Sequence, residues 1–269
     1  MRLCRRQTVI LVHQDVSEML AICYTATLPP PSKVSVSGQA VSREHNATHP
    51  HLAALLSTVS TLVRHRRDLV INVLPQLVKL YARLFELFGL PRQRSTVGGS
   101  EERVKRIVKR EWPVWLAAEG AAHGLGEEDA RAFARALVTL TSRTIIRTTS
   151  ASSTASAGTM IGQLSKHAPV LLIAYVRAVA HPLSTIPPSS RHELVPGIGA
   201  MCEAVVAGGK AMLGGAGSAS GSGGASENRT AESVGEAFGL GEGSGGDGEL
   251  IVWGEMWRAW RRSRYVGQG

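Results

Sequence analysis

The sequence predicts an all-α protein whose antiparallel helix pairs form a bundle or a solenoid-like array. Three observations support this fold class. In several segments of the 269-residue chain, apolar residues recur at steps of three and four, which places them on one face of a helix. No segment shows the period-two alternation and hairpin turns that are typical of strands. Gly, Pro and Ser gather between the helical segments, where they favour loops.

The first helices are expected at residues 7–26, 50–67 and 68–88. Pro50 opens the second of these, and the basic cluster Arg64–Arg67 closes it, where cations complement the helix dipole. The connection to the third helix is short, which favours an antiparallel pair. Two segments around these helices, 28–49 and 91–100, are expected to be flexible because they are rich in turn-forming residues.

Two further helices are expected at 101–124 and 127–148, followed by a low-complexity segment, 149–160, that should be flexible. The chain is organised around the next helix, at 163–180. Its apolar stripe is so wide that the helix should be buried at the centre of the domain. Pro169 lies inside the stripe and should bend or restart the helix, because it lacks an N–H group.

A later helix at 189–213 should be interrupted near Pro196 and Gly197. Residues 214–249 are rich in Gly and Ser and are expected to be a flexible insertion. The final helix has two faces, one with Trp253, Trp257 and Trp260 and the other with Arg258, Arg261 and Arg262. We expect the Trp face to dock on the core, with stacking on single-stranded RNA bases as the alternative. Residues 1–269 are thus expected to form a single helical domain.

The charge and the cysteine content of the chain indicate classes of partner and compartment, but they do not identify a single partner. The formal net charge of +9 favours an acidic partner such as nucleic acid, an anionic membrane or an acidic protein. Three widely spaced cysteines predict no disulfide framework and fit a reducing compartment. No apolar run reaches the roughly 18–20 residues of a membrane span, so no membrane-spanning segment is expected. For the main hypothesis below, we expect no membrane among the partners.

The sequence contains no motif that would support catalysis. A nucleophile elbow, an HExxH zinc motif, a calcium loop and a complete phosphate-binding loop are all missing. His45, His49 and His51 lie close together but lack further ligands at metal-binding spacing. We therefore expect no enzymatic activity, no cofactor, no bound metal and no small-molecule substrate.

Basic stripes are the main candidate contact surfaces. Arg103, Arg106 and Arg110 recur at i, i+3 and i+7, which places them on one face of the predicted 101–124 helix. The second stripe is the Arg face of the final helix, Arg258, Arg261 and Arg262. Each stripe is either a solvated helix face or a surface that contacts phosphates without reading bases.

Several segments, taken in order, resemble one known family. They are RALVTLTSR at 135–143, the core around KHAP, LL and Tyr at 166–175, the PGI turn at 196–198 and the basic-aromatic end WRAWRRSRYVG. Together they are similar to the C-terminal domain of the unhealthy ribosome biogenesis protein two family of nucleolar pre-ribosomal-associated proteins. The residues that carry the resemblance are Lys166, His167, Pro169, Leu172, Tyr175, Pro196 and Gly197.

The resemblance implies a non-enzymatic scaffold for large ribosomal subunit biogenesis and pre-rRNA processing in the nucleolus. Its partners would be other pre-ribosomal assembly factors and pre-rRNA, contacted directly or indirectly. Members of the family are longer helical proteins, so this chain would correspond to their C-terminal part. Two alternatives stay open from the residues alone: a basic helical adaptor that binds acidic proteins or membrane surfaces, and an RNA-binding protein imported into an organelle through its Arg-rich start.

Overall fold

The computed structural model describes residues 11–29, 48–91, 112–117, 124–142, 153–181, 184–213 and 246–265. It is all-α, as the hydrophobic periodicity predicts, apart from one antiparallel pair of two-residue strands. The elements are α1 (His13–Thr25), α2 (Pro50–His65), α3 (Arg67–Asn72), α4 (Leu74–Leu87), β1 (Leu90–Pro91), α6 (Val114–Ala117), α7 (Glu127–Thr141), α8 (Ser153–Ala180), β2 (Ser184–Thr185), α9 (Pro188–Leu213) and α11 (Gly246–Tyr265).

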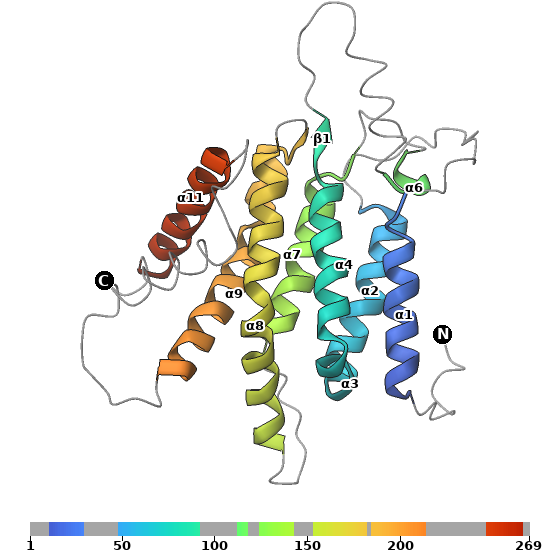
Figure 1. The fold of residues 1–269 in the computed structure, drawn as a ribbon. Coiled ribbons are helices and arrows are strands. Elements are labelled where there is room, and N and C mark those ends of the chain that lie inside the picture. Colours follow the sequence, from blue (N-terminus) through green and yellow to red (C-terminus); the bar gives the residue numbers. More distant parts are fainter. Residues whose placement is uncertain are drawn as a thin grey trace, which may run out of the picture.

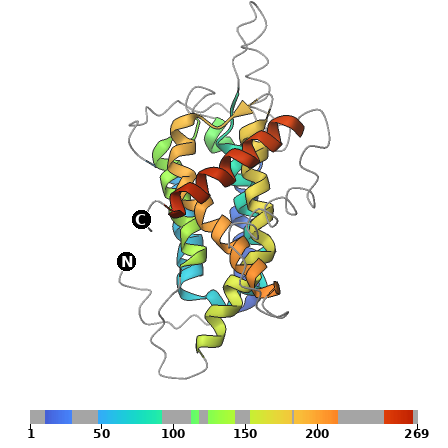
Figure 2. The ribbon, with the colours of Figure 1, turned by 90° about the vertical axis from the view of Figure 1, so that its left-hand side faces the viewer.

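The long helices other than α11 form two layers. Figure 1 shows α1, α4 and α8 side by side in front, with α2, α7 and α9 behind them, and Figure 2 shows the two layers from the side. Successive long helices alternate between the layers, and helices within one layer run parallel. Contacts between equivalent ends support this: β1 after α4 pairs with β2 after α8, and α7 and α9 are joined near their starts by Arg131 and Glu193. This is a solenoid-like arrangement of helix pairs.

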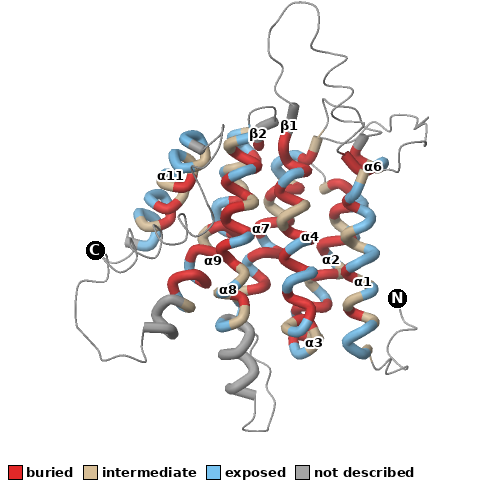
Figure 3. Tube along the Cα trace, in the orientation of Figure 1, coloured by how far each residue is buried: buried red, intermediate tan, exposed pale blue. Residues whose placement is uncertain are grey.

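The core lies between the layers, and Figure 3 shows buried residues along the helices of both layers. Its centre is aromatic. The ring of Phe133 on α7 contacts Tyr81 and Phe85 on α4 edge to face, with centroids 5.3 and 4.9 Å apart. Edge-to-face pairs at this separation are favourable beyond the area they bury. These contacts join the front layer to the back layer.

Helix α8 confirms the expectation of a buried central helix. Leu164, Ala168, Leu171 and Leu172 are fully buried, and α8 packs against both α4 and α9. The helix continues through Pro169, and it begins at Ser153 rather than at residue 163. Residues 153–160, which were expected to belong to a flexible segment, are therefore helical. Once the buried part has nucleated the helix, extension by one residue adds one hydrogen bond at little cost.

Helix α9 corrects a second expectation. It runs without a break from Pro188 to Leu213, so the predicted interruption near Pro196 and Gly197 is wrong, and PGI is not a turn. Pro196 removes one backbone hydrogen bond, but contacts with α7 and α8 hold the helix on both sides of it. Most of the residues in the segments predicted to be flexible, 28–49, 91–100, 149–160 and 214–249, lie outside the described residues.

Candidate functional site

The motif residues of α8 lie in two environments. Lys166 is exposed and His167 is half-buried, whereas Pro169, Leu172 and Tyr175 point into the core. Burial lowers the pKa of His167, with a smaller effect from the charge of Lys166. A half-buried His beside an exposed Lys offers a hydrogen-bonding surface.

The two motif residues of α9 face opposite ways. Pro196 is exposed, whereas Gly197 is buried against α7. A Cβ atom at Gly197 would lie 2.9 Å from Leu137 Cδ1 and 3.0 Å from the Cα atom of Ala134. Only a residue without a side chain fits this approach, so the motif glycine sets the distance between α7 and α9.

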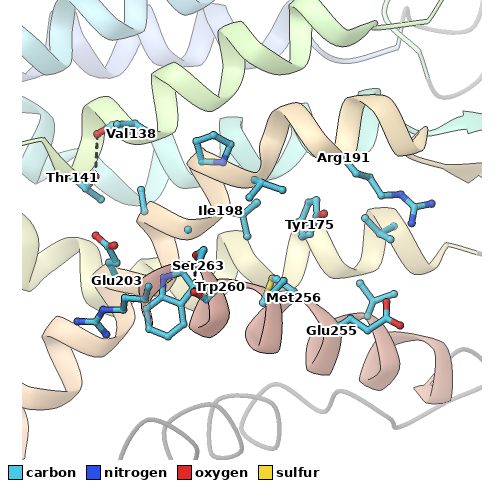
Figure 4. Close-up of a pocket in the computed structure, with 18 residues that line it drawn as sticks. Val138, Thr141, Tyr175, Arg191, Ile198, Glu203, Glu255, Met256, Trp260 and Ser263 are labelled. Carbon is cyan, nitrogen blue, oxygen red and sulfur yellow. Dashed lines mark hydrogen bonds between the residues drawn. The ribbon is translucent and has the colours of Figure 1, made fainter. Parts of the chain in front are cut away.

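Tyr175 and Pro196 come together at a pocket of about 690 Å³ that α7, α8, α9 and α11 share. Figure 4 shows α11 along one side of the pocket and α8 and α9 along the other. Most of the lining is apolar, but Arg191 and Glu255 lie toward one end and Glu203 toward the other, and Arg264 also lines the pocket. Val138 and Val195, which are 37% and 54% exposed, stand at its edge. The size and lining fit apolar side chains of a bound peptide.

Helix α11 docks through its Trp face, as expected. Trp253, Trp257 and Trp260 are each no more than 6% exposed and belong to the same core cluster as α8 and α9. Because these rings are buried, they are not available to stack on RNA bases. Arg258 and Arg262 are exposed on the other face, and Arg261 is half-buried. The guanidinium of Arg264 lies 5.2 Å from the ring centre of Trp260, within cation–π range.

The remaining candidate residues are the basic stripe at 103–110 and the three histidines. Arg103, Arg106, Arg110 and His45 lie outside the described residues. The His49 side chain accepts a hydrogen bond from the His51 N–H group and so caps α2. Both His rings contact Trp115, with centroids 4.6 and 5.9 Å away. Among the described residues, no cluster of three potential metal ligands is present.

Sequence reasoning missed two buried charged residues. Arg67, 8% exposed, donates from Nη2 to the carbonyl oxygens of Leu140 and Ser142 at 3.3 and 2.7 Å, which caps the end of α7. Asp129 is fully buried and accepts hydrogen bonds from the backbone N–H groups of His49 and Gly126. Both residues join α7 to the segment around α2, and their types are so common on surfaces that no sequence signal sets them apart.

Comparison with known protein families identifies the family of this chain. The sequence model of the Urb2/Npa2 family matches residues 1–222, well over half of the chain. The chain belongs to the Urb2/Npa2 family. This confirms the resemblance drawn from the α8 and α9 motifs. The match ends before α11, so the Trp/Arg helix lies outside it.

The Urb2/Npa2 family is a nucleolar family of ribosome biogenesis factors and is not known as an enzyme family. Membership assigns this chain a role in ribosome biogenesis. No curated protein and no solved structure matches the chain significantly. In the part of the chain that the structure describes, no helix has both the length and the apolarity needed to cross a bilayer.

Proposed function

We propose that this Urb2/Npa2 protein is a non-enzymatic scaffold that acts in the nucleolus, in large ribosomal subunit assembly and pre-rRNA processing. The family match over residues 1–222 is the observation that carries the proposal. Its partners are other pre-ribosomal assembly factors, together with pre-rRNA contacted directly or through them. The adaptor alternative, which has no ribosomal role, is disfavoured by the same match.

The surfaces of the molecule support this proposal. A two-layer array of parallel and antiparallel helices presents broad faces to several partners at once. The exposed guanidinium groups of Arg258 and Arg262 and the exposed ammonium group of Lys166 suit contacts with phosphate groups. The net charge of +9 would favour approach to RNA at long range. The pocket beside Tyr175 and Pro196 offers a contact for apolar protein side chains.

The test is affinity purification of the tagged full chain, followed by sequencing of the RNA and mass spectrometry of the proteins recovered. We expect precursors of the large-subunit rRNA and large-subunit assembly factors, a nucleolar tag, and a lowered ratio of large to small subunits after depletion. Recovery without such precursors, or a tag excluded from nucleoli, would contradict the proposal.

Charge reversal separates direct from indirect RNA contact. Arg258→Glu and Arg262→Glu each reverse one exposed charge on α11, and Arg64→Glu reverses an exposed charge on α2 as a matched control. If α11 contacts RNA phosphates, each α11 variant loses RNA crosslinks several-fold while the control does not, with proteins recovered unchanged. Equal losses in all three variants would show that only overall charge matters and would refute a contact at α11.

A further inference from the structure

Helix α11 covers a face that the family-matched part of the chain already forms. This α8/α9 face comprises Tyr175 and Val179 of α8 with Val195, Ile198 and Gly199 of α9. The family match ends at residue 222, whereas α11 begins at Gly246. Figure 2 shows α11 crossing obliquely over α9 and α8, outside the alternation of the two layers. Helix α11 therefore lies outside the residues that the family model matches.

The contact between α11 and this face is looser than the contacts within the array. A pocket of about 690 Å³ remains between them. The indole Nε1 of Trp257 is buried with no hydrogen-bond partner, which costs stability. The ion pair from α8 to α11, Arg177 with Glu249, spans 3.9 Å, which is long for an ion pair, and the Arg177 side chain is 56% exposed, so it adds little.

The contact between α7 and α9 shows the contrast. Arg131 makes a two-pronged ion pair with Glu193 at 2.8 and 3.1 Å. At Gly197 the two helices approach so closely that a Cβ atom would clash with the α7 backbone. An element with a cavity, an unpaired buried donor and a weak ion pair separates more readily than one with close packing and paired charges.

We propose that α11 is an exchangeable cover and that the α8/α9 face binds an amphipathic helix of a partner protein in its place. Helix α11 itself specifies the chemistry of this partner. Val252, Met256 and Trp260 recur at steps of four and line the pocket, so the partner helix carries large apolar residues at this spacing. Asp247 and Glu249 occupy the first turn of α11, and Glu249 meets Arg177, so the partner helix has an acidic first turn. The inference does not depend on a ribosomal role.

Because α11 is part of the same chain, it competes with the partner helix for the α8/α9 face and sets the affinity that the partner helix needs. Residues 214–245, rich in Gly and Ser, join α9 to α11. A tether of this kind holds its helix at an effective concentration of order millimolar, which a partner in solution must overcome. A substitution that weakens the packing of α11 on the α8/α9 face should therefore raise the apparent affinity of this face for a helix added as a separate peptide.

Hydrogen exchange of the unmodified full chain tests whether α11 opens by itself. We expect the amide groups of α11 to exchange at least tenfold faster than the buried amides of α7, α8 and α9, under conditions in which the core stays protected. If α11 exchanges only together with the core, it opens only by global unfolding and the proposal is wrong.

A labelled peptide of residues 246–265 then tests binding in trans by fluorescence anisotropy. The acceptors are the full chain and its Trp260→Ala variant, in which the cover loses one apolar anchor. We expect the peptide to bind the variant at least tenfold more tightly than the unmodified chain. A control peptide with Ser at positions 252, 256 and 260 should bind neither acceptor.

Each remaining outcome bears on the proposal. If the peptide binds neither acceptor, or binds both equally, the face does not exchange its helix. If the variant fails to fold, the exchange rates of the unmodified chain decide. Light scattering at several protein concentrations adds one more test. A monomeric chain supports the proposal of a partner helix. A dimer that the peptide dissociates would show that a second copy donates α11, and it would overturn the proposal.

Discussion

Substitution of Gly197 by alanine tests the closest approach in the structure. Gly197 lies inside α9, where alanine is the better helix former by about 1 kcal/mol. The added Cβ atom would lie 2.9 Å from Leu137 Cδ1 and 3.0 Å from the Cα atom of Ala134. The side chain of Leu137 has some freedom to rotate, but the backbone of Ala134 does not, so α7 and α9 must move apart.

The expected magnitude follows from these two opposing effects. Overpacking of a well-packed interface costs about 1–3 kcal/mol, and a clash with backbone belongs at the upper end of that range. After subtraction of the helix-propensity gain, Gly197→Ala should lower the free energy of unfolding by about 1–2 kcal/mol. A loss of 1.4 kcal/mol corresponds to about a tenfold change in the ratio of folded to unfolded protein.

Gly199→Ala is the matched control, because it is two residues away in the same helix. Its added Cβ atom would lie 3.6 Å from Trp260 Cδ1, an ordinary van der Waals contact. Here the helix-propensity gain is unopposed, and we expect stabilisation by about 0.5–1 kcal/mol. Urea unfolding followed by circular dichroism would measure both variants. A Gly197→Ala protein as stable as the unmodified chain would refute the role assigned to this glycine.

Three further substitutions test other features of the fold. Arg67→Met should lower the free energy of unfolding, measured by urea titration, by about 2–3 kcal/mol, because it leaves buried carbonyl groups at the end of α7 without a charged donor. As a control, Arg64→Met replaces an exposed arginine and should change the free energy of unfolding by less than about 0.5 kcal/mol. Tyr81→Phe should raise the melting temperature, because the buried hydroxyl has no hydrogen-bond partner, and a lower melting temperature would show that the group is satisfied. The pKa of Glu193 is held below its ordinary value near 4.5, chiefly by the hydrogen bond from Arg131. The stabilisation from the ionised Glu193 is therefore complete above about pH 4.5 and is lost as pH falls through the lowered pKa. Urea titrations at pH 7 and pH 3 should show that Glu193→Gln loses less stability between these pH values than the unmodified chain does. Identical pH profiles would contradict this.

Hydrophobic periodicity predicts the helices because burial and helical spacing are both local properties of sequence. Leu164, Ala168 and Leu171 recur at helical steps, and all three are fully buried. The Trp stripe of α11 is likewise visible in the sequence and likewise buried. Helix ends are less predictable, as the start of α8 at Ser153 shows, because an extension of a helix needs no apolar pattern.

The candidate site is predictable only in part. The motif residues Tyr175 and Pro196 can be found in the sequence, but they are 21 positions apart, and nothing local indicates that they line one pocket with α11. Pro196 was expected to interrupt α9 because proline removes a backbone donor. Neighbouring helices override that preference, since contacts on both sides of α9 outweigh one lost hydrogen bond.

The sequence by itself determines the all-α class, the buried central helix, the two faces of α11 and the kinship with the Urb2/Npa2 family. Each of these depends on residue patterns that can be read within segments of the chain, without knowing which segments meet. Only the tertiary structure decides that Arg67 and Asp129 are buried, that Gly197 sets the spacing of α7 and α9, and that α11 covers the α8/α9 face. The physical reason is that a capped carbonyl, a clash or a covered face depends on two segments far apart in the chain, and their meeting is set by how the layers pack.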